Sequence, residues 1–319
     1  MTSSKSRILI IGATGFIGRH FTKASLAEGH PTFLLVRDSA ASSSPEKAKL
    51  LESFRASGAN ILQGSLDDYA SLVEALKKVD VVISAVGDFQ RMSQINLIKA
   101  IKEVGNIKRF LPSEFAFEFD RFNDAVGPVK TVVDDSVKIR RAVEAEGIPY
   151  TYVICNCFAE YFVPCLGQVD LMVGITPPAP HPPTDKISIY GDGKSKAAFV
   201  KEEDIATYTI KTVDDPRTLN KFLYFMPPAN TLSANELVGV WEKMIGKTLE
   251  KDYVSEEELL KKIADAQPEL MKHYLSVCHY VFMKGDLTNF EIGPHGAEAT
   301  QLYPNVTYST VEDFLSRYV

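Results

Sequence analysis

The sequence has few cysteines, no long apolar segment and no excess of basic residues. Only four of its 319 residues are cysteine, too few for the disulfide framework on which small secreted domains depend. No run approaches the roughly 20 apolar residues of a membrane span, and residues 1–12 contain no stretch long enough for the apolar core of a signal peptide. We therefore expect a cytoplasmic protein with no membrane partner.

The charge balance and the cysteine spacing exclude further classes. Lys and Arg number 35 and Asp and Glu number 41, which gives a net charge of −6. A mildly acidic chain without a basic block argues against nucleic acid as a partner. Cys155 and Cys157 lie one residue apart in an apolar run, but a metal site needs further thiol or imidazole ligands nearby. We predict no metal site and interpret the cysteines as small buried hydrophobic residues.

The first half of the chain alternates strand and helix patterns. Its 45% hydrophobic and 24% charged residues are ordinary for a globular protein. Strands are predicted over 7–11, 32–36, 60–63, 79–85, 108–111 and 150–154, and helices over 16–28, 47–57, 69–78, 94–104 and 134–146. Such alternation indicates a parallel sheet with right-handed crossovers. The predicted fold class is α/β, a Rossmann-type doubly wound parallel sheet with a smaller α+β substrate-binding domain.

The pattern changes in the second half. Segment 167–186 holds five prolines and is predicted to be a loop near a functional site or a mobile flap. Strands follow over 187–190 and 221–226, and capping boxes at Ser233/Glu236 and Ser255/Glu258 announce two helices. We predict a nucleotide-binding domain over 1–157 and a mainly substrate-binding domain over 158–319, from which some segments return to the sheet.

A glycine-rich loop directly follows the first predicted strand and opens the first predicted helix. Gly12 allows the tight turn, Gly15 lets the backbone approach a pyrophosphate, and Gly18 permits close packing of helix on strand. Unpaired N–H groups at the helix N-terminus favour an anion there. We predict that the loop binds the pyrophosphate of a dinucleotide through Gly12, Thr14, Gly15, Phe16, Ile17 and Gly18.

Arg37 at the end of the second predicted strand indicates which dinucleotide binds. A site that prefers NAD usually places a carboxylate here, whereas an arginine accommodates a 2′-phosphate. Lys47, at the start of the next helix, adds a second positive charge. The predicted cofactor is NADPH. The alternative is that Arg37 is only a solvated residue at a strand end.

Several motifs resemble one known group of reductases. The helix over 134–146 has no tyrosine, which disfavours the common Tyr-x-x-x-Lys mechanism of short-chain dehydrogenases. Instead, the chain resembles the plant isoflavone reductase-like proteins, which include phenylcoumaran benzylic ether reductases, pinoresinol–lariciresinol reductases and eugenol synthases among the NmrA-like proteins. The resemblance covers nearly the whole chain. Its motifs are the glycine loop, residues 79–84, 106–115 and 148–153, Asn156-Cys157-Phe158 and residues 190–193.

The resemblance implies an NADPH-dependent reductase that transfers hydride to an electrophilic carbon of a small aromatic secondary metabolite of the phenylpropanoid or alkaloid type. It implies that Ser84, Ala85 and Val86 line the dinucleotide, and that Ser113, Glu114, Asn156, Cys157 and Phe158 flank its nicotinamide end. A homodimer is the prior expectation for the oligomeric state, since dimers are the commonest oligomers.

The sequence departs from this family at one catalytic position. The family motif Lys-x-x-[Ile/Val]-Arg supplies a lysine that acts as general base, but here Ser136 precedes Ile139 and Arg140. A serine hydroxyl does not accept a phenolic proton unaided. Lys138 lies two residues further on and is expected to face elsewhere. Ser136 therefore occupies the base position in a role that is polar rather than basic, whether the serine is natural or engineered.

Other groups remain as candidates for the missing chemistry. His279 is predicted either to supply a proton in the substrate pocket or to be a packed histidine, and Lys130, Asp134 and Asp135 either contribute or form an exposed face. An already electrophilic imine, enone or quinone methide needs no initiating base. Two alternatives to the reductase stay open: a non-catalytic NADP(H)-binding regulator or redox sensor, and a lyase or isomerase that retains NADP(H).

Overall fold

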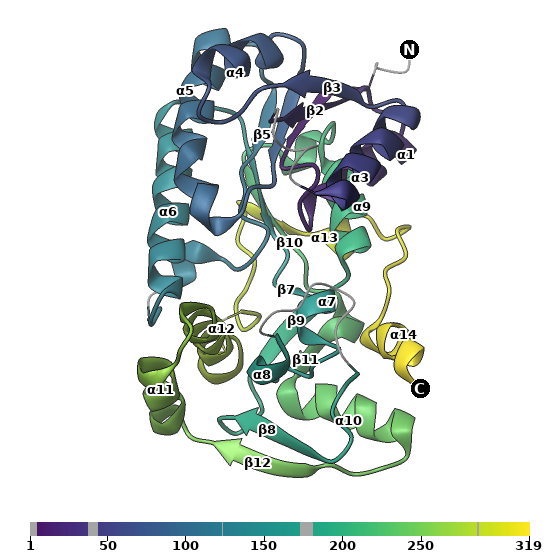
Figure 1. Cartoon of the computed structure of the whole chain (residues 1–319), viewed down its shortest axis with the longest axis vertical. Coiled ribbons are helices and arrows are strands. Elements are labelled where there is room, and N and C mark those ends of the chain that lie inside the picture. The colour runs from purple at the N-terminus through teal and green to yellow at the C-terminus, as the bar shows by residue number, and fades with distance from the viewer. Residues whose placement is uncertain (1–4, 38–43, 123, 173–180, 286) are drawn as a thin grey trace.

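A parallel sheet forms the centre of the upper half of the molecule (Figure 1). The structure, a computed structural model, describes residues 5–37, 44–122, 124–172, 181–285 and 287–319. Five parallel strands follow the order β3-β2-β1-β4-β5. Their bounds are β1 (Ile8–Ile11), β2 (Thr32–Val36), β3 (Asn60–Gln63), β4 (Val81–Ser84) and β5 (Arg109–Leu111). The predicted Rossmann-type fold class is confirmed by this order.

Helices cover both faces of the sheet because its central strands are apolar on both sides. In β1, Ile8 and Ile10 belong to one apolar core, whereas Leu9 and Ile11 belong to another, as the period of two in a strand requires. The first core is closed by α1 (Gly18–Ala27), α3 (Pro45–Ala56) and α9 (Glu202–Thr212), and the second by α4 (Tyr69–Leu76), α5 (Gln94–Val104) and α6 (Val129–Ala145) (Figure 1).

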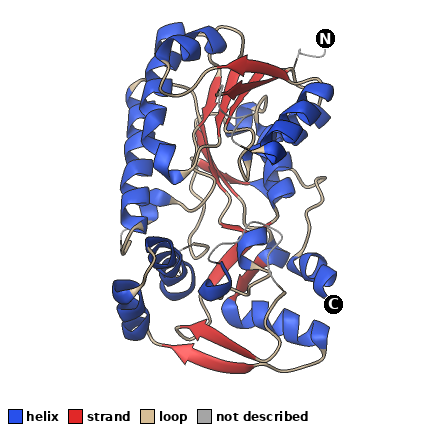
Figure 2. Ribbon diagram, in the orientation of Figure 1, coloured by secondary structure: helices blue, strands red, loops and turns tan. Residues whose placement is uncertain are grey.

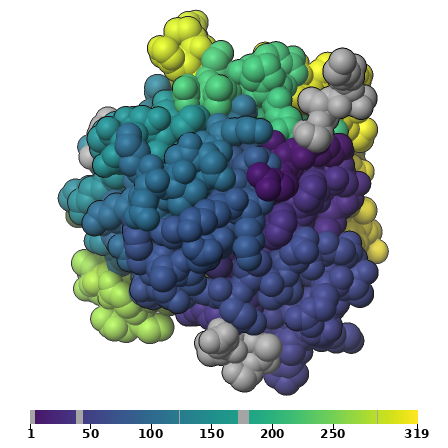
Figure 3. All heavy atoms as spheres, turned by 90° about the horizontal axis from the view of Figure 1, so that it is seen from above, coloured from purple at the N-terminus to yellow at the C-terminus, as the bar shows by residue number. Residues whose placement is uncertain are grey.

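Three more parallel strands continue the central layer. Strand β10 (Lys221–Tyr224) pairs with β6 (Thr151–Ile154) on one side and β13 (Gly296–Glu298) on the other. A bridge between Phe110 and Tyr150 links this group to β5. Segments from the second half of the chain therefore reach the upper end of the molecule, where they lie against the N-terminal residues (Figure 3).

The lower half combines short strands with helices around a separate apolar core (Figure 2). Trp241, the one tryptophan of the chain, is fully buried in this core. The strands are β7 (Cys157–Phe158), β8 (Lys186–Tyr190), β9 (Lys196–Val200), β11 (Thr231–Ser233) and β12 (Glu250–Val254). The helices are α7 (Ala159–Phe162), α8 (Val169–Met172), α10 (Ala234–Ile245), α11 (Glu256–Asp265), α12 (Glu269–His279) and α14 (Val311–Leu315). The short helix α13 (Ala299–Leu302) lies instead beside the central sheet, where Ala299 belongs to the core that contains Ile8 and Ile10.

Local sequence patterns located most elements, and the two predicted capping boxes are confirmed at the starts of α10 and α11. The predicted start of α6 at residue 134 was wrong, because the helix begins five residues earlier, at Val129. Val129 and Val133 are buried and extend the apolar face of the helix backwards from the predicted start.

The proline-rich segment is only partly described. Within the predicted loop over 167–186, residues Val169–Met172 form the short helix α8, ahead of the prolines. Residues 173–180, which include three of those prolines, lie outside the described residues. Within the described ranges, no helix combines the length and apolarity needed to cross a membrane.

Candidate functional site

The glycine loop between β1 and α1 is held tightly against the next strand of the sheet. Gly12 has a φ of +83°, and a Cβ on it would meet the carbonyl oxygen of Ala85 at 2.2 Å. A Cβ on Gly18 would meet the carbonyl oxygen of Gly12 at 2.1 Å. Only glycine fits at these two positions. The loop therefore lies at the edge where β1 and β4 end, between helices on opposite faces, which is where doubly wound folds bind ligands.

One pocket at this edge is lined by two basic side chains, Arg37 and Lys47, and by one acidic side chain, Asp67. It has a volume of about 200 Å³ and is lined by the glycine loop together with Val36, Arg37, Lys47 and Val86. Arg37 follows β2 and is exposed, while Lys47 lies in the first turn of α3, whose N-cap is Ser44. We call this site the basic pocket. The structure thus brings Gly12, Thr14, Arg37 and Lys47 together, and their donors suit a phosphate group.

A second pocket meets the first at Val86 and is lined by aromatic rings. It has a volume of about 430 Å³. Phe16 packs on Phe158 with ring centroids 5.6 Å apart and on Tyr161 at 4.5 Å. We call this site the aromatic pocket. Its walls include the predicted residues Gly15, Phe16, Ile17, Ala85, Val86, Ser113, Glu114 and Phe158. Burial raises the pKa of Tyr161 to about 12, so its phenol stays a hydrogen-bond donor at neutral pH.

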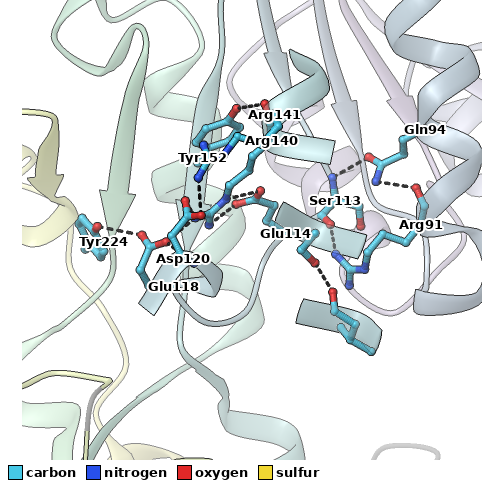
Figure 4. Close-up of polar contacts among 12 residues, drawn as sticks. Arg91, Gln94, Ser113, Glu114, Glu118, Asp120, Arg140, Arg141, Tyr152 and Tyr224 are labelled. Carbon is cyan, nitrogen blue, oxygen red and sulfur yellow. Dashed lines mark hydrogen bonds and ion pairs between the residues drawn. The ribbon is translucent and has the colours of Figure 1, made fainter. Parts of the chain in front are cut away.

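Ser113, in the wall of the aromatic pocket, is fixed at every polar atom (Figure 4). Its N–H donates to Gln94 Oε1 at 2.9 Å, and its hydroxyl donates to the carbonyl oxygen of Val86 at 2.6 Å. Its own carbonyl oxygen accepts a hydrogen bond from Arg91. These contacts tie the segment after β5 to the segment after β4, which is where the two halves of the pocket wall meet.

Glu114 is held by a buried arginine (Figure 4). Arg140 on α6 donates from Nε and Nη2 to the two oxygens of Glu114, both at 2.7 Å, and from Nη1 to Glu118 and Asp120. The side chain of Arg140 is 0% exposed. Burial lowers the pKa of Arg140, but the attraction of Glu114 and Glu118 exceeds that effect and raises the pKa well above its usual value. Glu114 is therefore a fixed part of the wall.

Four predicted cofactor residues lie behind the pocket walls. Gly18 packs the helix on the strand, and Ser84 is fully buried at the end of β4. Asn156, with a φ of +56°, donates from Nδ2 to the carbonyl oxygen of Phe225 at 2.9 Å. Cys157 is buried in β7, and burial raises the pKa of its thiol. All four cysteines are free and buried, in agreement with their interpretation as hydrophobic residues.

Ser136 is buried in α6, one turn before Arg140. Its hydroxyl donates to the carbonyl oxygen of Val132 at 2.7 Å, and the described walls of the aromatic pocket do not include it. Lys138 faces solvent, as predicted, and pairs with Asp135 at 3.0 Å. Lys130 pairs with Asp134 at 3.0 Å and is likewise exposed. These lysines lie on the outer face of α6 and do not supply the amine that Ser136 lacks.

His279, the other predicted catalytic residue, is buried at the end of α12. Its Nε2 lies 2.9 Å from Glu256 Oε1, and its Nδ1 has no hydrogen-bond partner among the described residues. Neither the basic pocket nor the aromatic pocket counts His279 among its described lining residues. No group of three His, Cys, Asp or Glu side chains in the described part of the chain is suited to hold a metal ion.

Sequence reasoning missed Asp88, Arg91 and Tyr161, which line the aromatic pocket. Asp88 and Arg91 belong to the 3₁₀ turn η1 (Asp88–Ser93) that follows β4. Their position after a central strand marks this edge of the sheet. Tyr161 lies on α7, and no local pattern connects that helix with Phe16.

The sequence matches the NmrA-like family over residues 4–315. It is 63% identical over 316 residues to phenylcoumaran benzylic ether reductase PT1 of Pinus taeda, with 99% of each chain covered. It is 57% identical over 317 residues to eugenol synthase 1 of Petunia hybrida, again with 99% of each chain covered.

Solved structures give the same result. An isoflavone reductase crystal structure superposes with a TM-score of 0.91 at 44% identity, and covers 99% of this chain and 100% of its own. The structure of AtPrR2 with NADP+ and (+)pinoresinol has a TM-score of 0.90 at 43% identity, with 99% of each chain covered.

Proposed function

The chain belongs to the NmrA-like family, and from this premise we propose that it reduces a small aromatic metabolite of the phenylpropanoid or alkaloid type by hydride transfer to an electrophilic carbon. It is an NADPH-dependent oxidoreductase of the isoflavone reductase-like type. The relatives named above include reductases of phenylpropanoid-type compounds. The observation that carries the proposal is the pair of pockets that meet at Val86, one basic and one aromatic.

The residues at this edge fit NADPH. The cradle formed by Gly12 and Gly18 leaves no room for a Cβ, and the backbone N–H groups of this loop would approach the pyrophosphate. Arg37 and Lys47 line the basic pocket and would hold the 2′-phosphate by charge-assisted hydrogen bonds. When bound, NADPH supplies the hydride that reduces the substrate carbon.

The aromatic pocket orients the reacting partners. Phe16, Phe158 and Tyr161 exclude water and present ring faces to an aromatic substrate. Ser113 and Glu114 are immobilised by their hydrogen bonds, so they shape the nicotinamide end of the crevice without having to move. Position 136 carries a serine, which has no amine to accept a proton from the substrate. Without such a base to generate an electrophile, the substrate carbon must already be electrophilic before the hydride arrives.

Steady oxidation of NADPH, followed at 340 nm with a panel of aromatic imines, enones and quinone-methide precursors, tests the proposal. Turnover of at least one acceptor, with a reduced product by mass spectrometry, supports it. Tight binding of NADPH with no turnover of any acceptor indicates the non-catalytic sensor instead. A product without added hydrogen indicates a lyase or isomerase.

A further inference from the structure

Two carboxylates line the aromatic pocket, and only one is open to a ligand. Glu114 is 3% exposed, and both of its oxygens accept hydrogen bonds from Arg140. Asp88 has 43% of its side chain exposed. It is the first residue of η1, directly after Gly87, and lies at the mouth of the pocket. Asp88 is therefore the most exposed of the charged side chains that line this pocket.

The two carboxylate oxygens of Asp88 differ in their partners. Its Oδ1 accepts a hydrogen bond from Arg91 Nη2 at 2.6 Å, whereas Oδ2 has no partner among the described residues. The guanidinium of Arg91 is turned inwards, with 7% of the side chain exposed, where it donates to the carbonyl oxygen of Ser113 and lies 5.6 Å above the ring of Phe119. The pair is thus oriented, with its negative end at the pocket mouth and its positive end buried.

No other cation balances Asp88 among the described lining residues, since Arg91 is the single Lys or Arg there. Position 136, where the resemblance implies a lysine, is a serine, and the neighbouring lysines on α6 face solvent. The described walls otherwise consist of small residues, aromatic rings and the paired Glu114. A positive charge on a bound ligand therefore meets no repelling amine at the pocket mouth.

The charge of Asp88 acts on two side chains of α12, His273 and Tyr274. Burial lowers the pKa of His273, and the negative charge of Asp88 opposes that change. Burial also raises the pKa of Tyr274, and Asp88 adds to the rise. These two side chains, whose rings lie 5.8 Å apart, are therefore within electrostatic reach of Asp88.

We propose that Asp88 is a specificity-determining residue that selects cationic aromatic substrates, such as a ring bearing an iminium or a protonated amine, and disfavours carboxylates. The inference rests on the reductase function proposed above. An iminium needs no base: the hydride forms the new C–H bond, the electron pair of the C=N bond moves to nitrogen, and the product is a neutral amine with NADP+. A cationic substrate of this kind needs no lysine base at position 136, and the exposed carboxylate of Asp88 attracts its positive charge.

The test uses three probes with one ring and three charges: 4-hydroxy-3-methoxybenzylamine, the corresponding benzyl alcohol and the corresponding benzoic acid. Calorimetric titration at pH 7 into the protein saturated with NADP+ gives the three Kd values. The amine is expected to bind at least about tenfold more tightly than the acid, because the two probes differ by two charges beside a half-exposed carboxylate. Asp88→Asn should reduce that ratio to about one to threefold.

Matched variants separate charge from damage to the site. Asp88→Glu keeps the charge and should keep the preference for the amine. Asp252→Asn removes an exposed carboxylate of β12 and should leave the ratio unchanged. An unchanged ratio in Asp88→Asn, equal binding of amine and acid by the original chain, or binding of none of the probes overturns the inference. NADPH oxidation with neutral acceptors is measured in parallel, so the reductase function is judged independently.

Discussion

We predict that Arg140, which holds Glu114 in the wall of the aromatic pocket, contributes strongly to the free energy of unfolding. Its guanidinium makes four hydrogen bonds to Glu114, Glu118 and Asp120, and its side chain is 0% exposed. Arg140→Met keeps much of the volume but leaves Glu114 and Glu118 buried without their cation. Removal of one partner of a buried ion pair costs about 3–5 kcal/mol of unfolding free energy. That is a large part of the roughly 5–15 kcal/mol that stabilises a typical domain.

The neighbouring Arg141 is a matched control. Its side chain is 54% exposed and pairs with Glu144 and Asp120, so Arg141→Met should cost at most about 1 kcal/mol. Urea unfolding, followed by far-UV circular dichroism and by the fluorescence of the buried Trp241, measures both variants. The double variant Glu114→Gln/Arg140→Met should recover part of the loss. Equal costs for the Arg140 and Arg141 variants would refute the assignment of Arg140 as the support of this wall.

Three further outcomes are expected. Arg37→Ala should weaken NADPH binding by about 1.5–3 kcal/mol, the value of a hydrogen bond to a charged group, and leave NADH nearly unchanged in fluorescence titrations. Ser136→Lys should create reduction of phenylcoumaran benzylic ethers, detected by chromatography and mass spectrometry, because it restores a base. Burial raises the pKa of Glu202 well above its usual value, so the carboxyl keeps its proton in the folded protein at a pH where it ionises in the unfolded chain. The free energy of unfolding therefore falls as the pH rises through that window, and Glu202→Gln should remove this fall.

Each of these has a contradicting result. Equal loss of NADPH and NADH affinity would show that Arg37 does not read the 2′-phosphate. A Ser136→Lys protein that binds NADPH but reduces no benzylic ether would show that the pocket, and not only the base, differs from the family. For Glu202, urea midpoints at pH 5 and pH 8 that change equally in the original chain and in Glu202→Gln would contradict the buried neutral carboxyl.

Much of the fold could be predicted from the sequence because its patterns are local. Short apolar runs in β2 and β3 predicted these two strands, and Gly105 ended α5 as expected, with a φ of +70°. The start of α6 was misplaced because its first turn depends on buried contacts of Val129 and Val133 with the lower core. Those contacts come from residues distant in sequence.

The two pockets likewise differ in how much of each could be predicted from local sequence patterns. Gly12, Arg37 and Lys47 lie within the consecutive elements β1, α1, β2 and α3, so local patterns and residue types were enough to group them, and the structure brings them into one pocket. The aromatic pocket joins residues from the loops after β1, β4 and β5 with α7, and Tyr161 reaches Phe16 across 145 positions. Arg91 turns inwards because it donates to the carbonyl oxygen of Ser113, and this leaves Asp88 exposed. No local sequence pattern predicts that contact.

Transfer of a labelled hydride tests the proposed reductase function most directly. The protein is incubated with NADPH carrying deuterium at C4 of the nicotinamide, in both stereochemical forms, and with an acceptor that it turns over. We predict that one of the two forms gives a product one mass unit heavier, with the deuterium on the former electrophilic carbon. A product formed without deuterium from either form, while NADPH remains unconsumed, would contradict hydride transfer as the reaction of this protein.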